Sequence, residues 1–135
     1  MIENNIEKMI HLSAKVQNLS VDLYKMVDKQ KKLDEFMSKD IQRSSLHLYT
    51  NSAELCEKED EFFRELGLFG ALRLHLMSLN SQLLMCFQLG MLNSDVCIDF
   101  GYRLESLKNE VQEYYNIAKI EMENKNPFKD FEDEE

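Results

Sequence analysis

Apolar residues recur at alternating intervals of three and four near the C-terminal end of the chain. The residues at these positions are Cys97, Phe100, Leu104, Leu107, Val111, Tyr114 and Ala118. Such heptad spacing predicts a long helix with one narrow apolar face. A second run upstream follows the same spacing through Phe62, Leu66, Phe69, Arg73, Leu76, Asn80, Leu83 and Phe87. Two adjacent helices with such faces are typical of half of a helical bundle.

Two more helices are expected in the N-terminal half of the chain. The first covers residues 2–28, where apolar positions occupy more than one face. A charged connection, residues 29–37, follows it. The hydroxyl of Ser38 can then cap the free N–H groups of a second helix, which is expected to end near Lys58.

The C-terminal pair is expected over residues 60–90 and 93–123. Gly90 can adopt the left-handed backbone conformation that ends helices, and Asn93-Ser94-Asp95 can cap the helix that follows. Short connections place successive helices antiparallel to one another. The sequence therefore predicts an all-α protein, an up-down-up-down antiparallel four-helix bundle.

The domain organisation is expected to be simple. Residues 1–123 form one bundle domain, because 135 residues with 44% apolar content suit a single core. Residues 124–135 form an acidic tail that is expected to be disordered.

In the second helix, Ser45 and Ser52 are small enough to let a neighbouring helix approach closely.

Two polar residues interrupt the apolar positions of the third helix. Arg73 and Asn80 can mark an oligomer interface, because a polar residue in such a position often fixes register or subunit number. Alternatively, the helix is rotated so that both residues are peripheral. Its main apolar face is then Leu72, Leu76, Leu79 and Leu83. Either arrangement leaves more apolar surface than one core can bury, which favours self-association.

The net charge of −9 argues against a uniformly basic nucleic-acid-binding protein. Residues 129–135 hold five acids and one base, so they supply −4 of this charge. A local basic cluster remains, and it consists of Lys25, Lys29, Lys31, Lys32, Lys39 and Arg43. Four acidic residues lie among them, so this segment can equally be a solvated turn between helices.

No membrane-spanning segment, export signal, metal site or cofactor is expected. The most apolar segment is interrupted by Arg73, His75 and Asn80, so it falls short of the roughly 20 apolar residues that a spanning helix needs. The N-terminal residues lack the pattern of an export signal, so a cytoplasmic location is expected. The cysteines are expected to be reduced and to play no part in metal binding. They are Cys56, Cys86 and Cys97.

Two helical segments carry a motif pattern. Residues 40–54 read Asp-Ile-Gln-Arg-Ser-Ser-Leu-His-Leu-Tyr-Thr-Asn-Ser-Ala-Glu, and residues 81–92 read Ser-Gln-Leu-Leu-Met-Cys-Phe-Gln-Leu-Gly-Met-Leu. They resemble the Gln-Leu-Arg-Arg-Ala-Ala, Asn-Ile-Ala-Glu-Gly and Thr-Gln-Leu-Leu-Leu-Ala-Tyr-Glu-Leu-Gly-Tyr-Leu stretches of the ribosomal-RNA intervening-sequence protein family. The matching positions are Arg43, Asn51, Ala53, Glu54, Gln82 and Gly90. Tyr49 and Leu55 stand where that family usually has proline and glycine.

The resemblance implies a four-helix bundle that assembles as a ring, commonly a pentamer, and has no known catalytic residues. It also implies partners. One branch of the family is the accessory variability determinant of diversity-generating retroelements, which binds a reverse transcriptase and nucleic acid. That branch is strongly basic whereas this chain is acidic. Direct RNA binding would therefore require the basic clusters of neighbouring subunits to converge.

Enzymes built on helical bundles fit the sequence less well. A magnesium-dependent pyrophosphohydrolase needs paired carboxylates on two helices. One half of such a site is available in Glu54, Glu57, Asp60 and Glu61. The second half is missing, and no Glu-x-x-His pair indicates a di-iron centre. Arg43 and His47 resemble the Arg and His pair of HEPN ribonucleases, but they stand closer together than that pair does.

The sequence thus predicts a non-enzymatic, self-associating accessory protein with an RNA-linked partner such as a reverse transcriptase. The alternative is a small acidic adaptor or chaperone that grips a partner helix in an apolar groove and never contacts nucleic acid.

Overall fold

The computed structural model describes the backbone of residues 2–57 and 62–124 and the side chains of residues 7–55 and 67–124. The helices in these ranges are α1 (Ile2–Lys29), α2 (Glu35–Glu57), α3 (Phe62–Gln88) and α4 (Ser94–Asn124). No strand occurs in the described part. The predicted all-α four-helix bundle is therefore confirmed. The segment expected to form an acidic tail lies, after Asn124, outside the described residues.

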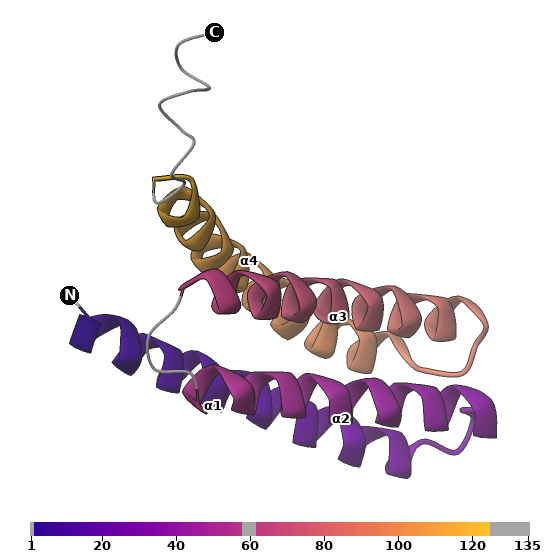
Figure 1. Cartoon of the computed structure of the whole chain (residues 1–135). Helices are drawn as coiled ribbons and strands as arrows, with labels where there is room; N and C mark the ends of the chain where they lie inside the picture. Colours follow the sequence, from indigo (N-terminus) through magenta and orange to yellow (C-terminus); the bar gives the residue numbers. More distant parts are fainter. Residues whose placement is uncertain (1, 58–61, 125–135) are drawn as a thin grey trace, which may run out of the picture.

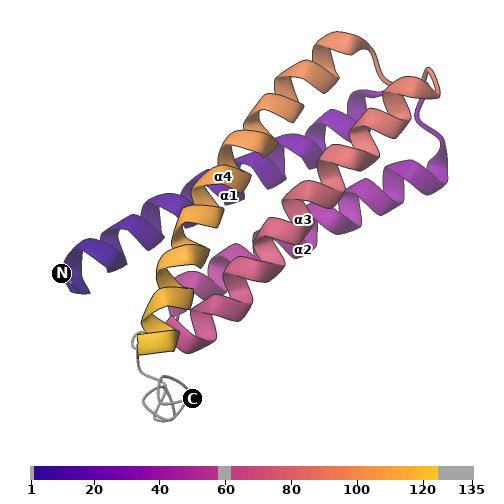
Figure 2. The same cartoon turned by 90° about the horizontal axis from the view of Figure 1, so that it is seen from above.

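The helices form two antiparallel pairs, stacked in two layers (Figure 1). α1 packs along α2, α3 packs along α4, and the layers meet chiefly through α2 and α3. α1 and α4 make little contact, and the C-terminal part of α4 rises away from the lower layer (Figure 1). Seen from above, the C-terminal part of α4 also diverges from the N-terminal part of α1 (Figure 2). Ion pairs link these two helices, Lys15 to Glu110 at 3.3 Å and Arg103 to Asp22 at 2.8 Å. Partly exposed pairs stabilise little, so the buried contact between α2 and α3 mainly holds the layers together.

The core confirms the predicted apolar face of α4. Phe100, Leu104, Leu107, Val111 and Ala118 are buried, and the other two members of the heptad run are half-buried.

α3 follows the rotated arrangement, with Leu72, Leu76, Leu79 and Leu83 all buried. Arg73 and Asn80 lie beside this face rather than on it. Side chains at the start of the predicted run, Phe62 to Leu66, lie outside the described part of the chain.

Two of the predicted helix ends are confirmed, and they bracket the connection between α3 and α4. Gly90 has a φ of 77°. Its N–H donates to Phe87 O at 3.0 Å while the N–H of Met91 donates to Cys86 O at 2.8 Å, which is a Schellman motif. Asn93 caps α4, because its side-chain oxygen accepts the N–H of Val96 at 2.9 Å.

The predicted cap of α2 is wrong. The N–H of Met37 donates to the Asp34 carboxylate at 2.7 Å, so Asp34 is the cap and Ser38 lies inside the helix. A carboxylate at this position also interacts favourably with the helix dipole. The connection between α1 and α2 is accordingly short, residues 30–34, rather than the expected 29–37.

Serines line the contact between α1 and α2, as expected for Ser45 and Ser52. Both are buried, and so are Ser13 and Ser20 on α1. The Ser13 hydroxyl donates to Ser52 O at 2.8 Å, which joins the two helices across their interface. Small hydroxyl side chains that find a partner allow close packing without an unpaired buried group.

None of the helices, over the residues that the structure describes, is long and apolar enough to cross a membrane.

Candidate functional site

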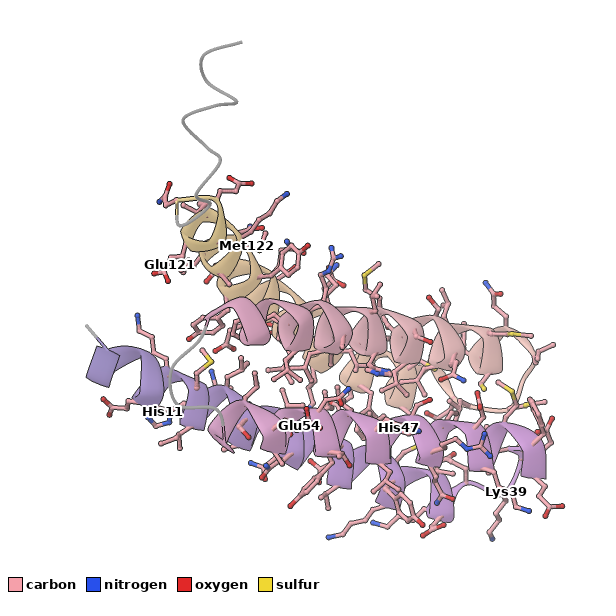
Figure 3. The ribbon with its side chains drawn as sticks, viewed as in Figure 1. His11, Lys39, His47, Glu54, Glu121 and Met122 are labelled. Carbon is pink, nitrogen blue, oxygen red and sulfur yellow. The ribbon has the colours of Figure 1, made fainter. Side chains whose placement is uncertain are left out.

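The predicted basic cluster gathers at one end of the molecule. Lys25 and Lys29 lie in the last turns of α1, Lys31 and Lys32 in the connection, and the other two members on the first turns of α2. All six side chains are exposed. Figure 3 labels Lys39 at this end of α2.

Each of the four neighbouring carboxylates has a partner within the same chain. Asp34 caps α2, and Asp28 accepts a hydrogen bond from Gln42 at 2.8 Å. Asp40 accepts one from Gln82 on α3. Glu35 pairs with Lys39 at 2.8 Å.

The other five cations are Lys25, Lys29, Lys31, Lys32 and Arg43, and none of them has an ion pair within the described residues. Six bases against four acids still leave this segment only weakly positive. The cluster is therefore an available but modest binding surface for phosphate.

The family-motif residues are spread over two helices. Arg43 is exposed on the first half of α2, whereas Asn51, Ala53 and Glu54 are half-buried near its end. No ion pair joins Arg43 to Glu54 within the described residues. On α3, Gln82 connects to α2 through its hydrogen bond to Asp40. Gln82, through this hydrogen bond, and Gly90, at the end of α3, stabilise the bundle, and the motif positions do not converge on one site.

Arg73 and Asn80 both contact α4 of the same chain. The Arg73 guanidinium donates from Nη1 to Gln112 at 3.0 Å and lies 5.2 Å above the centre of the Tyr115 ring. Its Nε atom is buried without a hydrogen-bond partner. Asn80 lies against Gly101, where a Cβ atom would stand 3.3 Å from its side-chain oxygen. Their assignment to an oligomer interface stays a prediction.

A histidine pair joins the two layers, and sequence reasoning missed it. His47 on α2 stacks on His75 on α3, with ring centroids 6.3 Å apart and an interplanar angle of 10°. Figure 3 shows His47 midway along α2. Burial, and then the proximity of His47, lower the pKa of His75. The pairing depends on the register between helices, which residue spacing along one chain does not reveal.

Among the side chains that the structure describes, no further cluster of chemically reactive groups accompanies this pair. Over the described residues, no group of three or more His, Cys, Asp or Glu side chains could hold a metal ion. Cys86 and Cys97 are free, and burial raises the pKa of each thiol, with Asp34 and Cys97 adding to the effect at Cys86. Cys56 and the acidic residues 57, 60 and 61 lie outside the described side chains.

The outward side of α3 differs from the other described surfaces because it carries no exposed charge. Between Leu66 and Ser94, Arg73 is the only residue with a formal charge. Every residue that is exposed between Gly67 and Gln88 is uncharged. The residues are Gly67, Leu74, Met77, Ser78, Ser81, Leu84, Met85, Phe87 and Gln88. In contrast, each of the other three helices, α1, α2 and α4, has charged side chains among its exposed residues.

Large apolar side chains dominate this surface. Leu74 is 59% exposed, Leu84 54% and Met85 53%. The start of α4 lies beside the end of α3, since the Cys97 thiol donates to Leu83 O at 3.4 Å. Two more exposed apolar side chains of α4 follow there, Ile98 at 70% and Tyr102 at 77%. Sequence reasoning predicted excess apolar surface but did not locate it on this side of α3.

Comparison with family models, with curated proteins and with solved structures found no match to this chain. The resemblance to the intervening-sequence family therefore rests on the motif positions alone.

Proposed function

We propose that this chain is a non-enzymatic accessory protein that associates with itself and binds partners through surfaces rather than by chemistry. The uncharged outward side of α3 carries the proposal. A helix that is apolar all round is normally buried, and a contiguous exposed apolar patch usually marks a protein interface. Water contact with Leu74, Leu84 and Met85 costs free energy that a covering protein would recover.

Measurement of native molar mass tests self-association. The chain has a mass of 16.0 kDa, and an assembled form should give a multiple of it that decreases on dilution. Leu84→Glu combined with Met85→Glu should return the protein to the monomer mass, because two carboxylates would have to be desolvated at the interface. Thr50→Glu, a charge added to an exposed position of α2, is the control and should leave the mass unchanged. A mass of 16.0 kDa for the unaltered protein at high concentration would refute the proposal.

A second activity, contact with RNA through the basic cluster, is supported by the unpaired cations described above. Five of the six cluster cations have no ion pair among the described residues and can contact phosphates, whereas Lys39 is paired with Glu35. In an assembly, several copies of the cluster would act together, which multiplies a modest single site. Together with the family resemblance, this observation extends the proposal to an RNA-linked partner such as a reverse transcriptase.

Titration of a structured RNA at several salt concentrations tests this activity. Lys29→Glu with Lys32→Glu should weaken binding and flatten its salt dependence, because fewer counterions are released. Lys8→Glu with Lys119→Glu changes the net charge equally, outside the cluster, and should have a smaller effect. Equal losses in the two double variants would show that only net charge matters. If the unaltered protein binds no RNA, the acidic adaptor is the better description.

A further inference from the structure

The exposed stripe of α3 is nearly symmetric about its middle residue. Ser81 lies at the centre, and exposed residues follow at three, four and seven positions on both sides. Before Ser81 they are Ser78, Met77 and Leu74, and after it they are Leu84, Met85 and Gln88. These spacings keep all seven residues on one face of a helix. The exposed positions are therefore spaced alike in both directions, and a methionine lies four positions from Ser81 on each side.

We infer that this stripe pairs with the same stripe of a second copy, antiparallel, across a two-fold axis that passes near Ser81. This inference rests on the proposed function and names its partner and geometry. A two-fold interface uses the same patch on both subunits. Ser81 then faces its own copy, Met77 faces Met85 of the partner subunit, and Leu74 faces Gln88 of the partner subunit. The small Ser81 side chain lets the two helices approach closely at their crossing point.

The charge distribution favours a second copy as the occupant. A partner for an uncharged face must itself present an uncharged, apolar face, since a charged group would lose its hydration there without finding a counter-charge. Among the four helices, over the described residues, only α3 presents such a face. Pairing two α3 helices covers both faces at once. The charged residues nearby, Glu105 and Lys108, pair with each other at 2.8 Å at the border of the stripe.

A hollow beside the axis fits this arrangement. Its volume is about 160 Å³, and it lies between α3 and α4. The residues that line it are Leu76, Met77, Asn80, Ser81, Leu104, Glu105 and Lys108. Met77 and Ser81 border the hollow, and Met77 faces Met85 of the partner subunit across the two-fold axis. Met85 of the partner subunit therefore lies close to the opening of the hollow. A flexible thioether side chain is well suited to fill an irregular space of this kind.

The available area predicts a dimer of limited stability. Two adjacent helices, each about 10 Å wide, present a face on the order of 500 Å² over roughly 25 Å of length. Specific interfaces bury at least about 600 Å² per partner. The dimer should therefore dissociate on dilution. Because each copy carries −9, salt should strengthen this association by screening the repulsion, whereas salt weakens RNA binding.

Disulfide cross-linking of cysteine variants tests the geometry. Full-length protein is exposed to an oxidant at a concentration where its native mass exceeds the 16.0 kDa of one copy. Ser81→Cys should form a covalent dimer, because the two sulfurs meet at the axis. Leu74→Cys should not link to itself, since two copies of position 74 lie about 21 Å apart along antiparallel helices, well beyond disulfide reach. A mixture of Leu74→Cys and Gln88→Cys should give the mixed dimer. The unaltered chain controls for its own thiols.

Each alternative result overturns the inference in a distinguishable way. Covalent dimers of Leu74→Cys alone would indicate parallel helices. No linkage of Ser81→Cys above the unaltered chain, in a protein that does assemble, would show that the oligomer uses another arrangement such as a ring. The proposed function would survive both results. A protein that is monomeric at every concentration would refute the inference and the proposed function together.

Discussion

Two leucines two residues apart on α3 test which side of this helix belongs to the core. Leu76 is fully buried, whereas Leu74 is 59% exposed. Leu76→Ala should lower the free energy of unfolding by about 3–5 kcal/mol, because the removed side chain leaves a cavity in a packed core. Leu74→Ala should cost less than about 1 kcal/mol, since less than half of the Leu74 surface is withdrawn from water in the single chain.

Urea unfolding followed by far-ultraviolet circular dichroism measures both changes, at a concentration low enough to keep the chain monomeric. A bundle of this size has about 5–15 kcal/mol of stability, so both variants should remain folded. At higher concentration Leu74→Ala should instead weaken self-association. Equal destabilisation by both substitutions, or a larger loss for Leu74→Ala, would refute the assigned orientation of α3.

Three further perturbations probe single features. Gly90→Ala should lower stability by about 1 kcal/mol in chemical unfolding, because an alanine is strained at a φ of 77°. Gly67→Ala, inside α3 with no atom within 4 Å of the added Cβ, should raise stability by up to about 1 kcal/mol. A stabilising Gly90→Ala together with a destabilising Gly67→Ala would contradict the assignment of Gly90 as the residue that ends α3. Because the pKa of His75 lies below its usual 6.5, the unfolded chain binds more protons near that pH, and stability should fall as the pH drops below about 7. Melting curves at two pH values should show a smaller loss for His75→Gln, and an unchanged loss would exclude His75 as the cause. Removal of residues 129–135 should leave the melting temperature unchanged, and a lower one would show that this segment packs against the bundle.

The fold was predictable because periodicity along one helix depends on local spacing. The face of α4 from Phe100 to Ala118 and the helix end at Gly90 both follow from such patterns. The start of α2 was not predicted, because Asp34 and Ser38 are both acceptable caps and the geometry of the preceding turn selects between them.

Contacts between helices were much harder to predict. The stack of His47 on His75 and the contact of Arg73 with Tyr115 depend on register and rotation between helices. Excess apolar surface was expected from composition, but the rotation of α3 decides which residues are buried. Leu72 and Leu79 point into the core, whereas Met85 remains exposed. The uncharged stripe became recognisable only after that rotation was known.

Methionine oxidation measured by mass spectrometry tests most directly whether the outward side of α3 is covered in solution. In the single chain Met85 is 53% exposed, Met77 45% and Met122, near the end of α4, 36%. Exposed methionines oxidise readily to the sulfoxide, so in a monomer Met85 and Met77 should oxidise faster than Met122. If α3 pairs with a second copy, these two residues should react more slowly than Met122 at high protein concentration, and the order should reverse on dilution. Faster oxidation of Met77 and Met85 than of Met122 at every concentration would contradict a covered α3 surface.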